Sequence, residues 1–172
     1  MLLLVARATP RSFLIGLPIV VFGMMIRVWS SGYLSKMERL VTAGPFAMGR
    51  NPLYIGSFFI SLGYFVMCNQ PVFWVLGPIL FWLFHGGAIA YEEKLLEDKF
   101  GDDFREYCKS VPRIISFPHS LAGHGEFSLE QLKLNNEYRT IVGTVIAVGI
   151  FALLAYTPGH GMPICWLVSR IC

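Results

Sequence analysis

Four apolar segments divide the chain, and each is close to the length that crosses a lipid bilayer as a helix. They cover residues 12–29, 53–68, 72–90 and 141–156. One crossing takes roughly 20 mostly apolar residues. The pattern therefore predicts an all-α, multi-pass transmembrane bundle of about four membrane helices. Only the short polar break at residues 68–71 separates the second segment from the third, so these two are expected to form a helical hairpin.

Polar residues stand at both open ends of this hairpin. Arg50-Asn51-Pro52-Leu53-Tyr54-Ile55-Gly56 leads into it, and Glu92-Glu93 follows it. Two crossings return the chain to the face of the membrane that it left. The two polar segments are therefore expected to meet in space and to form one site at the mouth of the hairpin.

The composition changes the picture by indicating lipid as the solvent. Hydrophobic residues make up 55% of the 172 residues and charged residues 15%, whereas about 25% of a soluble domain is charged. The net charge of +3 is too small to indicate a nucleic-acid partner, and no segment combines a basic stripe with stacking aromatic residues. The four cysteines form no C-x-x-C pair, so neither a zinc site nor a disulfide framework is indicated. We therefore expect a lipid bilayer as partner, and neither nucleic acid nor metal.

The lysine and arginine residues predict an orientation. Eleven of the 14 fall on the side of the hairpin mouth, and the other three are Arg7, Arg11 and Arg170. Cytosolic loops carry the excess of Lys and Arg in membrane proteins, so the mouth is expected to face the cytosol. Arg27 closes the first apolar segment, and its long side chain is expected to reach the headgroups.

The segment that leads into the hairpin favours an anion. Asn51-Pro52 is typical of a helix start, with Asn as the N-cap and Pro in the first helical position. The free N–H groups of that helix would point at the mouth beside Arg50, which suits a carboxylate or a phosphate. Tyr54 offers a ring and a hydroxyl, and Gly56 permits the close approach of a ligand or a backbone. As alternatives, Arg50 can bind lipid phosphate and Tyr54 can belong to the aromatic belt of a membrane protein.

The two glutamates need a positive partner. They are expected where the third apolar helix ends, and the dipole of a helix disfavours anions at its C-terminus. A ligand could supply the partner, and a structural ion pair between Arg50 and Glu92 or Glu93 is the alternative. His85 lies seven residues before Glu92. An ionisable residue inside a membrane helix is a candidate for function, although a hydrogen-bonded packing role is the simpler interpretation of His85.

Apolar residues recur at helical spacing after the glutamates. Gly101 interrupts them, and Asp102 or Asp103 can cap the helix that follows. This helix could close over the mouth as a lid, or it could lie at the interface as an amphipathic helix. Further on, Ser128-x-x-Gln131 resembles a capping box that opens a surface helix. The apolar residues concerned are Leu96, Phe100, Phe104, Tyr107 and Val111.

Together these motifs resemble the integral-membrane methyltransferases, which include isoprenylcysteine carboxyl methyltransferase and the phospholipid methyltransferases. The resemblance covers residues 27–117 and rests on four ordered blocks. They are Gly44-Pro45-Phe46, the segment at residues 50–56, Glu92-Glu93-x-x-Leu96, and Phe100-Gly101-x-x-Phe104-x-x-Tyr107-x-x-x-Val111-Pro112-Arg113. Residues 1–172 are thus expected to form one membrane-embedded methyltransferase domain, with a surface helix, a last membrane helix and a tail in residues 118–172.

The resemblance implies S-adenosylmethionine as the methyl donor, bound at the cytosolic mouth. Its carboxylate would lie near the start of the second apolar helix, and the two glutamates would take its ribose hydroxyls or its ammonium group. The residues implied in cofactor binding are Arg50, Asn51, Pro52, Tyr54, Gly56, Glu92 and Glu93.

The methyl acceptor implied by the resemblance is lipophilic or delivered from the membrane. It could be a prenylcysteine carboxylate, a lipid amine or a similar group. A carboxylate needs no base, whereas an amine must lose a proton, which Glu93 or His85 could take. Relatives often carry Arg just before the Val-Pro pair, where this chain has Ser110, and Arg113 could compensate. Glu93, Arg113 and His85 are therefore the candidate catalytic residues.

Two other functions compete with this one. Membrane reductases of the sterol reductase type use NADPH and a similar hairpin, but they are larger than 172 residues. A non-enzymatic membrane protein could use the same polar residues for packing or assembly.

Overall fold

The computed structural model describes residues 6–35, 38–114 and 122–157 of the chain. Within these ranges it contains helices and no strand, which confirms the all-α expectation. The predicted tail from residue 158 onward lies outside the described residues. The helices are α1 (Pro10–Tyr33), α2 (Pro45–Met48), α3 (Pro52–Cys68), α4 (Pro71–Phe100), α5 (Asp102–Ser110), α6 (Leu129–Leu134) and α7 (Glu137–Tyr156).

Proline and short polar residues determine where the helices begin. α1, α2, α3 and α4 each start with a proline, because the first position of a helix needs no N–H donor and the fixed φ of proline suits it. Thr9 caps α1 in a capping box with Ser12. Ser128 is the N-cap of α6, but its hydroxyl accepts the N–H of Glu130 at 3.2 Å rather than forming the predicted capping box with Gln131.

Three helices, α1, α4 and α7, are long and apolar enough to cross a membrane. α3 is apolar but shorter, with 17 residues. About four membrane helices are therefore present, as the sequence predicted. Large apolar side chains such as Leu83, Phe84 and Val145 are exposed on the surface of the bundle, which suits a lipid environment.

α4 does not end near residue 90, and in this respect the sequence interpretation was wrong. The helix continues through the two glutamates to Phe100 and ends at Gly101, whose φ is +53°. The residues after Glu93 are mostly good helix formers, so nothing stops the helix before that glycine. Gly101 also precedes α5 without any side-chain cap, so the expected capping by Asp102 or Asp103 was wrong as well.

Glycines bring the backbones of α1 and α3 into close contact. A Cβ placed on Gly23 would lie 2.6 Å from the carbonyl oxygen of Gly56, and one on Gly63 would lie 2.9 Å from that of Gly16. The apolar core continues from this contact to α7, with Val20, Ile60, Met67 and Phe151 all buried.

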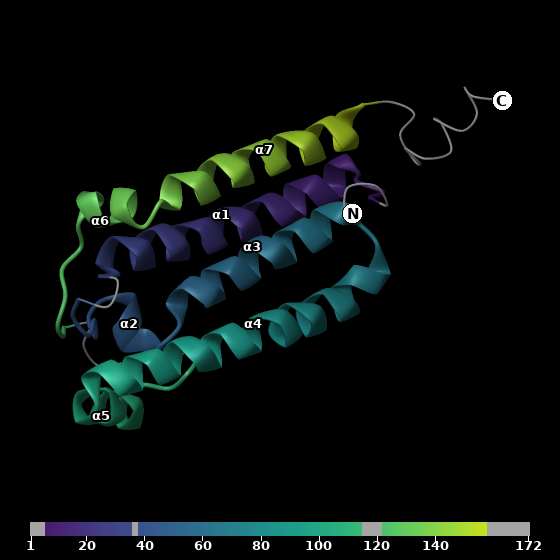
Figure 1. The fold of residues 1–172 in the computed structure, drawn as a ribbon. Helices are drawn as coiled ribbons and strands as arrows, with labels where there is room; N and C mark the ends of the chain where they lie inside the picture. The colour runs from purple at the N-terminus through teal and green to yellow at the C-terminus, as the bar shows by residue number, and fades with distance from the viewer. Residues whose placement is uncertain (1–5, 36–37, 115–121, 158–172) are drawn as a thin grey trace.

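The arrangement of the helices places all the polar segments at one end of the bundle. α1, α3, α4 and α7 run side by side, and α2, α5 and α6 gather at the end where α3 begins and α4 finishes (Figure 1). The turn between α3 and α4, with Asn69 in the left-handed conformation, lies at the opposite end. The hairpin therefore has a single polar mouth, as predicted.

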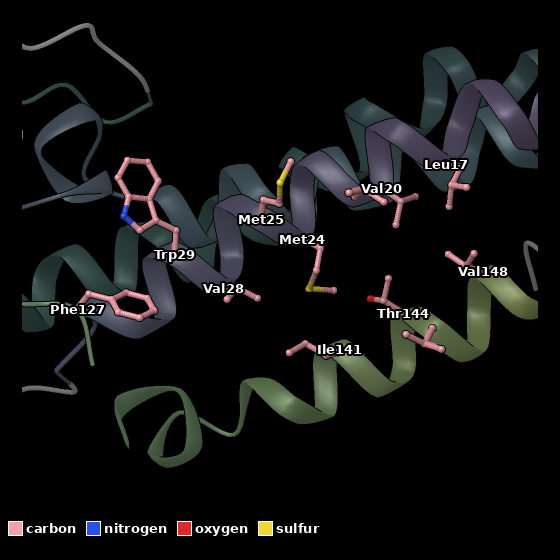
Figure 2. Close-up of a pocket in the computed structure, with 12 residues that line it drawn as sticks. Leu17, Val20, Met24, Met25, Val28, Trp29, Phe127, Ile141, Thr144 and Val148 are labelled. Carbon is pink, nitrogen blue, oxygen red and sulfur yellow. The ribbon is translucent and has the colours of Figure 1, made fainter. Parts of the chain in front are cut away.

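α7 packs against α1 and leaves an apolar groove beside it. The groove has a volume of about 570 Å³ and is lined by residues of both helices and by Phe127 (Figure 2). At the end nearer the polar mouth, Glu137 in the first turn of α7 contacts Arg27 of α1.

Candidate functional site

A cavity of about 690 Å³ opens at the polar end of the bundle. Arg50, just before α3, and Glu92, near the end of α4, both line it. The two ends of the hairpin thus share one cavity, as the sequence predicted. The other polar residues in its wall are Arg27, Ser31, Ser35, Arg39, Asn51, Tyr54, Ser57, His85, Tyr107, Asn135 and Glu137.

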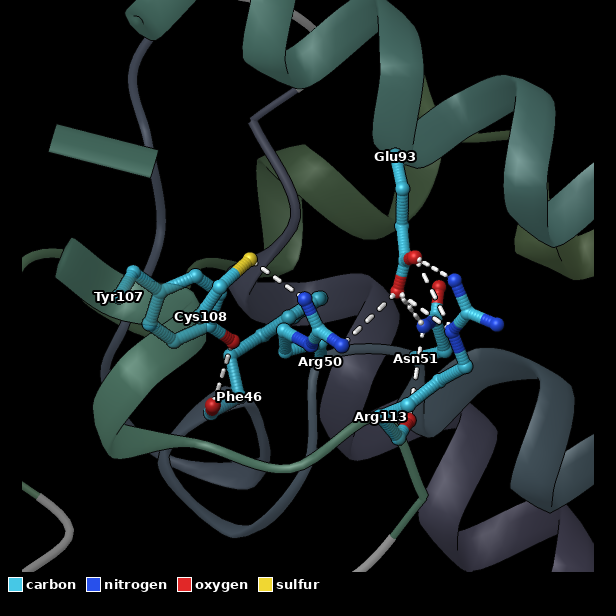
Figure 3. Close-up of polar contacts among 7 residues, drawn as sticks. All are labelled: Phe46, Arg50, Asn51, Glu93, Tyr107, Cys108 and Arg113. Carbon is cyan, nitrogen blue, oxygen red and sulfur yellow. Dashed lines mark hydrogen bonds and ion pairs between the residues drawn. The ribbon is translucent and has the colours of Figure 1, made fainter. Parts of the chain in front are cut away.

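Glu93 is the centre of a charged cluster beside this cavity (Figure 3). Only 8% of its surface is exposed. The Arg50 Nη2 atom lies 3.7 Å from Glu93 Oε1, and Arg113 donates from Nε to Oε2 at 3.0 Å and also from Nη2. The Asn51 side-chain amide donates to Oε1 at 3.0 Å. Glu93 therefore joins the start of α3 to α4 and to the segment after α5.

Arg113 and Glu93 do not belong to the cavity wall, unlike Arg50 and Asn51. Arg113 is about half exposed, and its hydrogen bond to Glu93 raises the pKa of the guanidinium above its ordinary value. The sequence interpretation treated both residues as candidates for direct chemistry. The structure places them behind Arg50 and Asn51, where they hold those two side chains in position.

Arg50 is also held from α5 and from the segment that follows. Its Nη1 atom donates to the sulfur of Cys108, and its backbone N–H donates to the Pro112 carbonyl at 3.0 Å. Next to it, the buried Tyr107 hydroxyl donates to the Phe46 carbonyl at 2.7 Å. Burial raises the pKa of the Tyr107 phenol, so this donor stays protonated at neutral pH.

Asn51 takes the predicted N-cap position of α3, and Pro52 takes the first helical position. The side chain of Asn51 makes no capping hydrogen bond, contrary to the expected capping. Its amide donates to the Glu93 carboxylate instead, because a hydrogen bond to a charged acceptor is stronger than one to a neutral group. Pro52 lines the cavity.

Tyr54 and His85 form the side of the cavity near Glu92. The Tyr54 hydroxyl donates to Glu92 Oε1 at 3.0 Å, and the rings of Tyr54 and His85 meet edge to face with their centroids 5.8 Å apart. The Nδ1 atom of His85 lies 2.8 Å from the Phe81 carbonyl, which can only accept, so Nδ1 carries the proton. His85 also stacks on the Phe81 ring at 4.1 Å. His85 thus combines a packing role with a position in the cavity wall.

Gly56, like Glu93, is a candidate cofactor residue that does not line the cavity. It packs against α1, where an added Cβ would lie 2.5 Å from Arg27 Cγ. Its lack of a side chain therefore serves the contact between α1 and α3.

Arg27 belongs to the site, and the sequence interpretation of its side chain was wrong. Its side chain does not reach toward the headgroups but binds Glu137 of α7 with two hydrogen bonds of 2.8 and 3.1 Å. It also donates to Ser57 and to the Leu53 carbonyl of α3. Glu137 is only 4% exposed. The polar run before the last apolar segment was a signal for Glu137, but nothing in it identified Arg27 as the partner.

Three buried polar atoms in the described ranges lack a hydrogen-bond partner in the protein, and all three belong to residues that line the cavity. They are Ser31 Oγ, Arg50 Nε and Asn135 Oδ1. Buried polar atoms are normally paired. These three atoms lie beneath the surface of the cavity wall and have no partner within the described part of the protein.

Comparison with known proteins identifies the family. The model of the phospholipid methyltransferase family matches residues 12–103, which cover α1 from its third residue onward and all of α2, α3 and α4. The chain belongs to the phospholipid methyltransferase family. This membership confirms the resemblance found in the sequence, and it leaves α6 and α7 outside the matched residues.

Individual relatives support the same assignment. Over 114 residues the chain is 33% identical to protein-S-isoprenylcysteine O-methyltransferase of Homo sapiens, covering 59% of this chain and 40% of that protein. It is 31% identical to protein-S-isoprenylcysteine O-methyltransferase B of Arabidopsis thaliana, covering 59% and 58%. A solved structure of the eukaryotic intramembrane Ras methyltransferase, isoprenylcysteine carboxyl methyltransferase, aligns with a TM-score of 0.53 and 26% identity, over 64% of this chain and 44% of that one. The chain thus matches only part of the length of each of these relatives.

Proposed function

We propose that this protein is an S-adenosylmethionine-dependent methyltransferase that modifies a lipophilic acceptor at the cytosolic face of a membrane. Family membership supports methyl transfer, and the names of the relatives favour a prenylcysteine carboxylate as acceptor. The observation that carries the proposal is the cavity itself, because Arg50 from one end of the hairpin and Glu92 from the other both line it.

The cavity fits the proposed donor in size and in charge. Its volume of about 690 Å³ lies within the roughly 300–1,000 Å³ of small-molecule sites. S-adenosylmethionine would supply a methyl group activated by its sulfonium sulfur. Arg50 and the first turn of α3, at Pro52 and Tyr54, would hold a carboxylate. The Glu92 carboxylate would bind hydroxyl groups or an ammonium group.

Glu93 and Arg113 would then act indirectly. The Glu93 carboxylate fixes Arg50 at the cavity wall and Asn51 at the start of α3. Arg113 balances the second oxygen of Glu93. Holding two reactants in alignment can lower a barrier by up to roughly 7–11 kcal/mol, so side chains that keep the wall rigid contribute to the rate without contact.

The cavity wall suits a carboxylate acceptor. Arg27 and Arg39 line it in addition to Arg50, and cationic groups favour the approach of an anion. A carboxylate needs no base. Because Nδ1 of His85 donates to the Phe81 carbonyl, Nε2 is the ring nitrogen that could take a proton. His85 is therefore the candidate base if the methyl acceptor is an amine.

The distribution of positive charge supports a cytosolic mouth. Arg7 lies at the far end of the bundle, where its N–H donates to the Cys68 carbonyl beside the α3–α4 turn, whereas Arg39 and Arg50 line the cavity at the mouth. This distribution agrees with the positive-inside rule.

The test is a binding and transfer assay on the purified full chain. We expect radiolabelled S-adenosylmethionine to bind and its methyl group to pass to S-farnesyl-N-acetylcysteine. Replacing Arg50 by Ala should weaken donor binding about 10- to 100-fold, because a hydrogen bond to a charged group contributes about 1.5–3 kcal/mol. Arg105→Ala is the matched control, since Arg105 is 61% exposed and pairs only with Glu97 and Asp102 among the interactions of the described chain.

Two results would contradict the proposal. Selective binding of NADPH would favour a reductase. Binding of neither compound, with no labelled product in lipid or protein extracts, would favour a non-enzymatic membrane protein.

A further inference from the structure

An ion pair between Arg27 of α1 and Glu137 of α7 lies in the wall of the polar cavity. The Glu137 carboxylate accepts from Arg27 Nε at 2.8 Å and from Nη2 at 3.1 Å, so both of its oxygens are used. Both residues are largely buried. A buried ion pair adds little net stability in general, because the cost of desolvation offsets the attraction. An ionisable pair on helices apolar enough to cross a membrane is instead a candidate for function.

The guanidinium group of Arg27 also contacts the first two turns of α3. Its Nη1 atom donates to the Leu53 carbonyl at 3.4 Å and to the hydroxyl of Ser57. The Ser57 hydroxyl in turn donates to the Leu53 carbonyl at 3.0 Å. Gly56 permits this approach, because a Cβ at that position would lie 2.5 Å from Arg27 Cγ. α7 packs on α1 and α1 packs on α3 (Figure 1), so Arg27 ties the start of α3, at the cavity wall, to α7.

The position of Glu137 is set by the corner between α6 and α7. Asn135 lies in this corner, and its side-chain amide donates to the Ser31 and Leu34 carbonyls at 2.8 Å each. These carbonyls belong to the last turn of α1 and to the residue after it. Asn136 then adopts a φ of +55° and leads into α7, of which Glu137 is the first residue. The dipole of a helix favours an anion in its first turn. The start of α7 therefore holds its carboxylate in a fixed place.

We propose that Glu137 is a positioning residue for the donor site: it holds Arg27 in place, and Arg27 holds the start of α3 at the cavity wall. This inference rests on the proposed function, in which Arg50 and the first turn of α3 bind the carboxylate of the donor. Both oxygens of Glu137 are engaged by Arg27, so Glu137 acts through Arg27 and not on the donor itself. α7 lies beyond the residues matched by the family model. The last helix of this chain thus supports a donor site whose Arg50 and Glu92 lie in the matched part.

Replacing Glu137 by glutamine tests the inference, because it keeps the shape of the side chain and removes the charge that holds Arg27. Titration calorimetry with S-adenosylmethionine gives the donor affinity separately from the number of binding-competent molecules. We expect the dissociation constant of the donor to rise about tenfold, the scale of the coupling within one hydrogen-bonded network. KM for the acceptor S-farnesyl-N-acetylcysteine should stay unchanged. Glu130→Gln is the matched control and should behave as the wild type, since Glu130 is exposed and does not line the cavity.

A second variant separates positioning from a purely structural role. Arg27→Met combined with Glu137→Leu replaces the pair by apolar side chains of similar size, which is often neutral for stability. We expect this double variant to fold and to show the same rise in the dissociation constant, because the start of α3 is no longer tied to α7. Wild-type donor affinity in the double variant would overturn the inference, since the pair would then serve stability alone. Fewer binding-competent molecules with unchanged affinity in Glu137→Gln would overturn it too.

The inference and the proposed function fail in different ways. If the wild type does not bind S-adenosylmethionine, the proposed function is overturned. If the wild type binds it and Glu137→Gln binds it equally well, only the role of Glu137 is overturned. Arg27→Lys gives a third measurement, because it keeps the positive charge but loses the planar fork that reaches both Glu137 and α3. Its donor affinity should fall as well, and an unchanged affinity would contradict the inference.

Discussion

Replacing Glu93 by glutamine tests whether the charged cluster at the mouth holds the site together. The substitution keeps the shape of the side chain and removes its charge. Glu93 is buried, and its carboxylate serves Arg50, Arg113 and Asn51 at once. Glutamine can still accept from Asn51, but it leaves two guanidinium groups without a counter-charge.

The size of the effect follows from where those two guanidinium groups lie. Breaking a buried ion pair costs about 3–5 kcal/mol when the remaining charge stays buried. Arg113 is 54% exposed and can turn to water, so it contributes little. The Arg50 side chain is 16% exposed and is also held by Cys108, so it cannot turn to water and its unpaired charge accounts for most of the lost stability. We therefore expect Glu93→Gln to lower the free energy of unfolding by about 3 kcal/mol, the lower end of this range.

Glu92→Gln is the matched control, because it makes the same chemical change one residue away. Glu92 is exposed and lines the cavity, and it accepts a hydrogen bond from the Tyr54 hydroxyl, which glutamine can still accept. Its effect on stability should stay within about 0.5 kcal/mol, while donor binding should weaken about tenfold, which corresponds to about 1.4 kcal/mol.

Two measurements on the protein in detergent separate these effects. A denaturant titration gives the free energy of unfolding, and calorimetry with S-adenosylmethionine gives the donor affinity. Equal stability of the two variants would refute the division of roles between Glu93 and Glu92. Unchanged donor affinity in Glu92→Gln would refute the proposed contact.

Two further predictions concern helix packing and pH. Gly63→Ala should destabilise the protein by about 1–3 kcal/mol in the same denaturant titration, because the new Cβ would meet backbone atoms of α1. The control is Gly149→Ala in α7. An added Cβ there meets nothing within 4 Å, so this substitution should stabilise the protein by about 0.5–1 kcal/mol. Burial raises the pKa of Tyr107 in the folded protein, so its contribution to stability is complete below about pH 10, the ordinary pKa of tyrosine, and is lost as the pH rises above it. Tyr107→Phe should cost about 1–3 kcal/mol at neutral pH by leaving the Phe46 carbonyl unpaired, and the difference from wild type should shrink in titrations above pH 10; a constant difference would contradict this reasoning.

The sequence predicted those features that follow from the length and order of its apolar segments. Two membrane helices joined by a short polar break return the chain to the face of the membrane that it left. This topology was enough to predict that Arg50 lies near Glu92 and Glu93. The family motifs then identified Asn51, Tyr54 and Arg113, which lie in or directly behind the cavity wall. Such deductions need only topology and local residue types.

The remaining features depend on which face of a helix meets which neighbour. Arg27 and Glu137 are 110 positions apart, and each could equally well have met lipid headgroups or water. Gly86 and Gly87 lie in an apolar helix as Gly56 does, yet an added Cβ at either of them would meet nothing within 4 Å. Uniformly apolar membrane helices carry little periodicity, so the sequence does not indicate the rotation of each helix about its axis.

The two adjacent glutamates show how helix geometry alone could have narrowed their roles. Successive residues of a helix point about 100° apart, so neighbours in sequence do not share a face. Once α4 is known to continue through residues 92 and 93, only one of the two can face the cavity. The other must turn toward the positive groups at the start of α3. In the structure Glu92 lines the cavity, and Glu93 forms ion pairs with the guanidinium groups of Arg50 and Arg113. In this chain the two adjacent carboxylates therefore have different surroundings: Glu92 lines the cavity, Glu93 binds Arg50 and Asn51 beside it, and exchanging these surroundings would require turning the helix.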